Sequence, residues 1–314
     1  MAIPTTLPAS WYCSPGLHQL ERRAVFLRSW FFLGTINKFQ IGESARFEIA
    51  QIELTAVTTA AGSVKAVKVF DESSVCRECR RPHTALAKFD ANDKGEEVRS
   101  HQTRTGLVFT TISSEAPSFD EFFPGLQDLL DSYDFTRLPH RRPLTYDGNF
   151  NWKTMMDGFQ ECLHCQFTHP GLSKLYPPTF YRVVNHHNWS RHFSNPDRDD
   201  DGLFLYFFPI STLNLYNGGM STFRACPSAK PGVSRMEFDY YNLQSGEEFE
   251  EYYKFVRQVA NEDFDLCESA QANLEKGVYT EGCLNPDKET GVDRVFEMVM
   301  AQHTREKEQR SQYT

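Results

Sequence analysis

The segment from Asn151 to Pro170 carries the residues of this chain that are best suited to chemistry. It contains two histidines, His164 and His169, and an acid, Glu161, three positions before the first histidine. Neutral imidazole is the commonest protein ligand for a borderline metal ion. Two histidines and one carboxylate, with coordination positions left open, are typical of non-haem Fe(II) sites that react with O2. The spacing therefore suggests a metal site that takes its carboxylate from elsewhere in the chain.

Asp263 is the candidate for that carboxylate. It lies in a predicted helix that runs from residue 247 to about 276, in which Leu266 and Ala270 mark the apolar side. Asp263 falls on or near that side, where an acid is costly unless it is paired or bound to a metal.

Other interpretations of the histidine segment stay open on the residues alone. A helix over 151–167, ended by Pro170, would place Glu161 and His164 on one face. Cys162 and Cys165 flank His164, which raises the alternatives of a zinc site or of a nucleophilic Cys–His pair. In a regular helix, however, Cys162 and His164 would point to different faces. Histidine pairs also recur by chance, and an acidic run is often a solvated helix face.

The composition limits the class of protein. With 314 residues the chain can bury a large core. Its formal net charge of −9 argues against a nucleic-acid partner, which needs a basic face. The sequence lacks a run of 18 apolar residues and a secretion signal at its start, so we expect no membrane span and a cytoplasmic location. Eight cysteines in a chain of this length fit a reducing compartment better than a disulfide scaffold.

The order of predicted elements favours an α+β fold. Short β-rich runs fill residues 32–70 and 107–112, so residues 1–113 are predicted to form a small β-rich domain. Residues 114–314 are predicted to form a second, catalytic domain in which a long helix lies over an antiparallel sheet, as in helix-grip folds. The strands predicted for this sheet cover residues 179–184, 203–208, 212–216 and 236–241.

The segment from Asn151-Trp152-Lys153 to His169-Pro170 resembles the catalytic domain of Rieske-type non-haem iron oxygenases. In that family an acid commonly stands three residues before a His-x4-His pair. The run from Glu262 to Gln271 resembles the segment that carries the third ligand of the family. Further matches to the choline- and carnitine-oxygenase-like branch lie at residues 7–12, 20–30, 277–279, 282–286 and 289–291.

The resemblance implies that His164, His169 and Asp263 bind Fe(II). It also implies that Glu161 corresponds to the acid that normally links the iron to the iron–sulfur cluster of a neighbouring subunit, within a homotrimer. Asp157-Gly158 departs from the family, which commonly has an Asn shortly before this acid, so the hydrogen bonding around the metal stays open.

The family's cluster motif is broken in this chain. A Rieske [2Fe–2S] cluster needs two cysteines and two histidines, supplied as Cys-x-His and Cys-x-x-His. Here Cys76 fits the first cysteine, but Glu78 stands where the first histidine is expected, and only Cys79 and His83 remain of the second half. We therefore expect no [2Fe–2S] cluster. A rewired metal site formed by Cys76, Cys79 and His83, with His101 as a fourth ligand, is the alternative.

These features predict a non-haem iron oxygenase-like oxidoreductase that uses O2 and works without its own cluster. Its electrons would come from an external donor or from the substrate, a small organic molecule such as a specialised metabolite. Aromatic residues make up 14% of the chain and permit a cage for a quaternary ammonium group, although core packing explains most of them equally well. The predicted pocket residues are Phe204, Tyr206, Phe208, Asn214 and Tyr216.

Two alternatives to an oxygenase remain. The same three ligands suit a Lewis-acid site in a non-redox lyase, isomerase or hydrolase. The chain could instead be a non-catalytic partner subunit, although an unused buried ligand set would be costly to keep.

Overall fold

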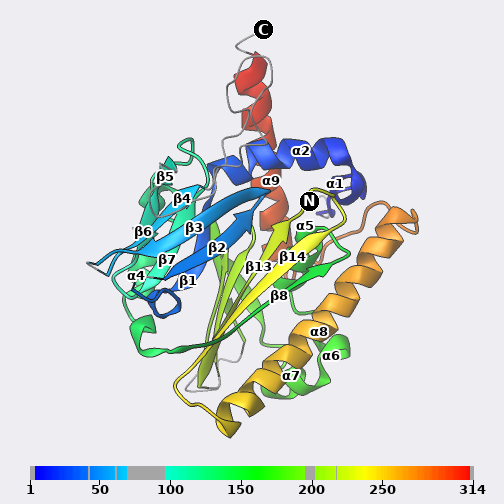
Figure 1. The fold of residues 1–314 in the computed structure, drawn as a ribbon. Helices are drawn as coiled ribbons and strands as arrows, with labels where there is room; N and C mark the ends of the chain where they lie inside the picture. Colours follow the sequence, from blue (N-terminus) through cyan, green and yellow to red (C-terminus); the bar gives the residue numbers. More distant parts are fainter. Residues whose placement is uncertain are drawn as a thin grey trace.

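The computed structural model describes residues 4–41, 43–60, 62–68, 96–194, 202–216 and 218–311. In these ranges, antiparallel strands form three sheets, and helices lie against the largest of them (Figure 1). The strands of the large sheet, in spatial order, are β8 (His140–Gly148), β14 (Ser234–Asn242), β13 (Gly219–Pro227), β12 (Ser211–Tyr216), β11 (Leu203–Phe207), β10 (Trp189–Phe193) and β9 (Arg182–Asn185).

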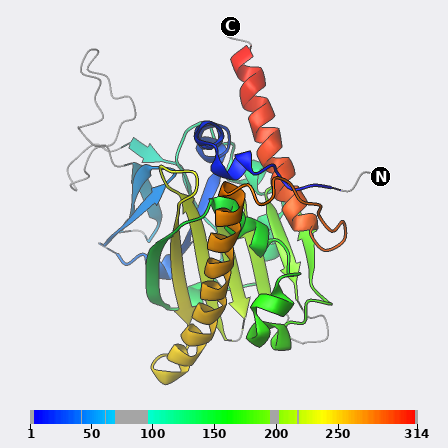
Figure 2. The same cartoon turned by 90° about the vertical axis from the view of Figure 1, so that its right-hand side faces the viewer.

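The long helix α8 (Glu247–Glu275) crosses one face of the large sheet (Figure 2). Its buried residues lie three, four or eleven positions apart, spacings that return to one face of a helix, and are Phe249, Tyr252, Val256, Cys267, Gln271 and Leu274. Asp263 lies on this stripe, seven positions after Val256 and four before Cys267. Leu266, which we expected on the apolar side, is 39% exposed, whereas the neighbouring Cys267 is buried.

The N-terminal part of the chain forms the two smaller sheets. One has the order β2 (Ser44–Ile49), β3 (Ile52–Thr58), β4 (Val64–Lys68) and β5 (Glu96–Val98), and the other β1 (Trp30–Thr35), β7 (Leu107–Thr111) and β6 (Ser100–Gln102). Strands β2 and β3 are joined through Ala50 and Gln51, both with positive φ, as a tight two-residue hairpin requires. These sheets pack on the large sheet, where the rings of Phe32 and Phe207 are 5.4 Å apart.

Helices complete the structure around the sheets. They are α1 (Ser10–Cys13), α2 (Pro15–Ala24), α3 (Phe119–Phe122), α4 (Leu126–Leu130), α5 (Trp152–Phe159), α6 (Cys165–Thr168), α7 (Pro170–Leu175) and α9 (Thr290–Ser311). The short 3-10 turns are η1 (Phe26–Arg28), η2 (Ile36–Lys38) and η4 (Phe135–Arg137). The prediction of an α+β fold with a helix over an antiparallel sheet is confirmed. Three of the large sheet's strands, β8, β10 and β13, were not predicted.

The start of the chain packs against its C-terminal part. The backbone N–H groups of Thr6 and Ala9 donate to the carbonyls of Gly282 and Thr280, and Leu7 lies in an apolar cluster with residues of α8 and α9. The boundary at residues 113 and 114 stays a prediction. In the described part of the chain, no helix is both long enough and apolar enough to cross a bilayer.

Candidate metal centre and its cavity

Helix α5 is anchored by the Asn-Trp-Lys sequence at its start. The Asn151 side chain caps the helix by accepting a hydrogen bond from the Lys153 N–H at 3.0 Å. The indole of Trp152 donates to Glu21 of α2 at 3.0 Å, and the Lys153 ammonium lies 2.5 Å from the same carboxylate. Both charged side chains of this ion pair are at most 1% exposed. The pair fixes α5 against α2 and so fixes the turn that follows α5.

The predicted continuous helix over 151–167 is wrong. Helix α5 ends at Phe159, a turn follows, and the short helix α6 begins at Cys165. Two side-chain contacts favour the break: the buried Gln160 amide bonds to His192 at 2.7 Å, and the Glu161 carboxylate accepts the backbone N–H of Leu163. Both hydrogen bonds draw the chain away from helical pairing. Glu161 and His164 still meet, but across a turn.

The structure brings together His164, His169 and Asp263. The Nε2 atoms of the two histidines are 3.2 Å apart. Oδ1 of Asp263 lies 2.9 Å from Nε2 of His169 and 3.4 Å from Nε2 of His164. Ligand atoms about 2.1 Å from a metal and at right angles to one another are about 3 Å apart. The three donor atoms therefore fit one metal ion, and they are the only group of this kind found among the described residues.

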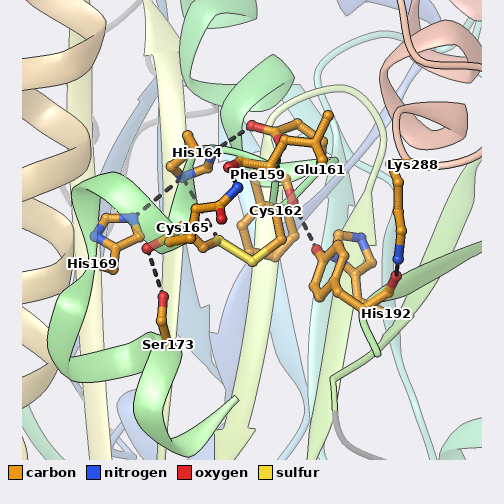
Figure 3. Close-up of a disulfide and its surroundings, with 12 residues drawn as sticks. Phe159, Glu161, Cys162, His164, Cys165, His169, Ser173, His192 and Lys288 are labelled. Carbon is orange, nitrogen blue, oxygen red and sulfur yellow. Dashed lines mark hydrogen bonds and ion pairs between the residues drawn. A yellow bond between two sulfur atoms is a disulfide. The ribbon is translucent and has the colours of Figure 1, made fainter. Parts of the chain in front are cut away.

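Two further acids orient the imidazoles. Nδ1 of His164 is bonded to Glu161, and Nδ1 of His169 lies 2.8 Å from Glu262 (Figure 3 shows His164 between Glu161 and His169). An acid on Nδ1 fixes the tautomer that presents Nε2 to a metal. Glu262 was not identified as a site residue from the sequence, although its position directly before Asp263 suggested that it lies near the same site.

These acids also control the charge of the histidines. Burial by itself lowers the pKa of His164, but the hydrogen bonds and charges of Asp263 and Glu161 outweigh burial and raise that pKa to about 10. Burial likewise opposes the upward shift in the pKa of His169 that Asp263 and Glu262 cause. The pKa of Asp263 is lowered by the two histidines, against the effect of its burial. Without a metal, the three groups therefore form a partly buried charge cluster, and a divalent cation can replace its protons.

Cys162 and Cys165 form a disulfide beside His164 (Figure 3). This differs from the expectation of reduced cysteines. The turn after α5 places their Cα atoms 5.0 Å apart, within the range that a disulfide bridges. Among the described cysteines, Cys13, Cys226, Cys267 and Cys283 are unpaired thiols.

A cavity of about 880 Å³, counting the part open to solvent, adjoins the three candidate ligands. Aromatic rings form much of its wall, namely Phe159, Tyr176, Tyr181, Phe204, Tyr216, Phe223 and Phe238. Its polar side chains other than those of the metal centre include His192, Ser194, Asn214 and Ser221.

Three of the five predicted pocket residues, Phe204, Asn214 and Tyr216, line this cavity. Tyr206 and Phe208 do not, which corrects the predicted lining. Tyr206 follows Phe204 by two positions on β11, so it lies further along the strand, where it is fully buried and donates to the Pro209 carbonyl at 2.8 Å. Phe208 is also fully buried, beyond the end of β11.

A hydrogen-bonded chain forms one polar part of the cavity wall. The side-chain oxygen of Gln160 lies 2.7 Å from Nε2 of His192, and the Tyr181 hydroxyl lies 2.5 Å from Nδ1 of His192 and donates to the Phe159 carbonyl at 3.3 Å. Burial lowers the pKa of His192 to about 3, which keeps this imidazole neutral. The Tyr181 oxygen therefore offers a lone pair, not a proton, to a molecule in the cavity.

Two other residues considered from the sequence, His101 and Asp157, do not line this cavity. Cys76, Cys79 and His83 are outside the described residues. His101 stacks on Phe119, with ring centroids 3.8 Å apart. Asp157 accepts a hydrogen bond from the Tyr12 hydroxyl at 2.6 Å, and burial raises its pKa to about 7.

Known proteins resemble this chain in sequence. It is 23% identical to the glycine betaine monooxygenase oxygenase subunit of Pseudomonas aeruginosa (strain UCBPP-PA14) over 54% of this chain and 46% of that protein. It is 24% identical to the carnitine monooxygenase oxygenase subunit of Escherichia coli (strain K12) over 87% of this chain and 85% of that protein. The chain thus spans about half the length of the glycine betaine relative that it matches.

Solved structures share the fold. The quaternary ammonium Rieske monooxygenase CntA in complex with L-carnitine superposes with a TM-score of 0.78 at 18% identity, over 96% of both chains. Naphthalene 1,2-dioxygenase from Rhodococcus sp. gives a TM-score of 0.70 at 15% identity, over 95% of this chain and 94% of that one. The family described as the ring hydroxylating alpha subunit (catalytic domain) matches residues 135–192 and 187–305. These ranges cover more than half of the sequence, including all three candidate ligands, and the chain therefore belongs to the ring-hydroxylating alpha-subunit family.

Proposed function

We propose that this chain is a non-haem Fe(II)-dependent oxygenase that oxidises a small organic substrate with O2. The observation that carries the proposal is the triangle of His164, His169 and Asp263 donor atoms beside an aromatic cavity. A ligand set of this kind leaves coordination positions open for O2.

When iron is bound at these ligands, it supplies the activation of O2. The protein residues hold and orient the reactants. Glu161 and Glu262 keep the Nε2 lone pairs of the two histidines directed at a common point. The aromatic rings of the cavity limit the entry of water, and the Tyr181 oxygen accepts a hydrogen bond from the substrate or from an ordered water.

We propose a positioning role for Glu161. Both of its carboxylate oxygens are engaged within the same turn, one with His164 and the other with the Leu163 N–H. This arrangement supports a function that does not depend on an iron–sulfur cluster in a neighbouring subunit. The family's trimeric assembly stays an expectation from the resemblance.

The proposal includes the absence of a Rieske cluster of the chain's own. Its support is the sequence, in which Glu78 replaces the first histidine and a shortened Cys79-x-x-x-His83 replaces the second half of the motif. Insertion of one oxygen atom consumes O2, two electrons and two protons and releases water. An external electron donor therefore supplies the two electrons.

The cavity favours a small organic cation as substrate. Aromatic faces attract cations, and aromatic rings form much of the cavity wall. Among the described residues that line the cavity, none is a lysine or arginine that would pair with an anion. The resemblance to a quaternary ammonium monooxygenase is consistent with a quaternary ammonium substrate.

Metal analysis together with O2 uptake tests this function. The full chain, loaded with Fe(II) without oxygen and desalted, should hold about one iron per chain and no acid-labile sulfide. It should consume O2 when given a substrate and a reductant. Asp263→Ala should lose the iron, whereas Asp265→Asn, on the exposed side of α8, should keep it. Sulfide in the protein would disprove the cluster-free proposal, and turnover without O2 uptake would favour the Lewis-acid alternative.

A further inference from the structure

The candidate ligand His164 lies inside the small ring closed by the Cys162–Cys165 disulfide. The ring contains only Cys162, Leu163, His164 and Cys165, so the disulfide restricts the backbone that carries this imidazole. The Cys165 sulfur is 4.0 Å from Nε2 of His164, the atom that faces the other ligands. Both cysteines also line the cavity.

We propose that Cys162 and Cys165 are a reversible thiol–disulfide site, which takes a small dithiol as reductant and sets the metal affinity of the centre. The proposal rests on the proposed function, because it takes His164 to be a metal ligand.

The position of the disulfide explains why its redox state would change metal binding. The turn between α5 and α6 is held by the disulfide and by hydrogen bonds, among them those from the Leu163 N–H to Glu161 and from the Ser173 hydroxyl to the Cys165 carbonyl. A preformed turn has less conformational freedom to lose when a metal binds. Reduction removes the covalent restraint, so part of the metal-binding free energy must be spent on ordering the backbone that carries His164.

The location of the sulfurs selects the reductant. Cys162 and Cys165 are 8% and 5% exposed, and they contact the cavity. A small dithiol inside the cavity can reach a sulfur that is this deeply buried more readily than a large protein can. The other described cysteines lie away from this wall and do not pair, which makes Cys162 and Cys165 a distinct redox pair.

The dithiol supplies both electrons and both protons that reduction of the disulfide requires. One thiolate of the reductant attacks a sulfur of the Cys162–Cys165 bond and forms a mixed disulfide, and the second thiolate then displaces the protein sulfur. The reductant leaves as a cyclic disulfide. Two electrons pass to the protein, and the two protons of the reductant end on the Cys162 and Cys165 thiols.

Peptide mapping and Co(II) binding together test the inference. The full chain is purified in air, and half is reduced with dithiothreitol and freed of it under nitrogen. Alkylation and mass spectrometry should show a Cys162–Cys165 disulfide in the first sample and two labelled thiols in the second. Co(II), followed by its visible absorption, should bind the reduced protein about tenfold more weakly, the size of effect expected when the support of a metal ligand is lost.

Variants separate this effect from general damage. Cys283→Ser, which removes an exposed thiol away from the site, should respond to reduction as the parent protein does. The double variant Cys162→Ser/Cys165→Ser should bind Co(II) as weakly as the reduced protein and should not respond to dithiothreitol. If the double variant does not fold, the comparison of oxidised and reduced parent protein still decides.

Three results would overturn the inference. The first is the absence of the disulfide from the air-purified protein. The second is Co(II) affinity that is equal in both redox states, which leaves the proposed function intact. The third is tighter binding after reduction with a thiolate-to-cobalt absorption band, which would make the cysteines ligands instead of a restraint. Failure to bind Co(II) in either state would remove the proposed function as well.

Discussion

Nδ1 of His169 lies 2.8 Å from Glu262, and its Nε2 lies 2.9 Å from the next residue of α8, Asp263. One imidazole is thus held at both nitrogens by two consecutive residues of one helix. This is possible because His169 lies at the junction of α6 and α7, and α6 packs against α8. The position of His169 therefore depends on α8 as much as on its own segment.

The contact between Glu262 and His169 leads to a first prediction. Glu262→Gln removes the charge that fixes the imidazole but keeps a similar shape, so Fe(II) or Co(II) affinity should fall about tenfold. Asp265→Asn is the matched control, because it also removes one negative charge from α8 but is exposed. Equal effects of the two variants in a chelator competition assay would mean that the loss reflects net charge alone.

A second prediction concerns pH. Because the His164 pKa is about 10 in the metal-free protein, a proton occupies the imidazole at neutral pH and must leave when a metal binds. Metal affinity should therefore rise with pH up to about 10, by about tenfold per pH unit for each proton displaced. Calorimetry in buffers of different ionisation enthalpy should detect release of about one proton or more at pH 7.5. Binding without proton release would show that His164 is already neutral.

A third prediction concerns the buried Glu21–Lys153 pair. Glu21→Gln leaves the Lys153 ammonium buried without a counter-charge, which typically costs about 3–5 kcal/mol of unfolding free energy. Glu250→Gln breaks the exposed Arg142–Glu250 pair and should cost at most about 1 kcal/mol. Urea denaturation of the two variants measures the difference. Similar losses would contradict the view that Glu21 is an anchor of α5.

A fourth prediction concerns substrate charge. Choline and glycine betaine share a trimethylammonium group, but one ends in a hydroxyl and the other in a carboxylate. Because the described lining offers no lysine or arginine, choline should bind the Fe(II)-loaded protein about tenfold more tightly in the absence of oxygen. Calorimetric titration with both ligands tests this. Tighter binding of glycine betaine would contradict the prediction and show that its carboxylate meets a cation, which would be the iron itself if the preference disappears in the metal-free protein.

The ligand set was accessible from sequence because it depends on local spacing and on a costly acid within an amphipathic helix. His164, His169 and Asp263 were named on those grounds and on the family resemblance, and the structure places their donor atoms together. The end of helix α5 at Phe159 could not be predicted from local sequence. It depends on the hydrogen bond between Gln160 and His192, which are 32 positions apart in the chain.

The cavity lining was harder to predict for a similar reason. Alternation along β11 correctly groups Phe204 with Tyr206 on one face, but it does not say where along the strand the cavity ends. Phe159, Tyr176 and Tyr181 reach the cavity from outside the two strands that were considered. Their contribution depends on tertiary packing.

The ion pair of Glu21 with Lys153 has a consequence for how this protein can be divided or recombined. A fragment beginning at residue 114 would retain Lys153 but lose its counter-charge, together with the acceptor of the Trp152 indole. A chimaera that takes its first 113 residues from a relative would need an acid at the position of Glu21. Residues 1–113 therefore supply the support of α5 on which the metal centre depends, and the two parts of the chain can be exchanged only as a matched set.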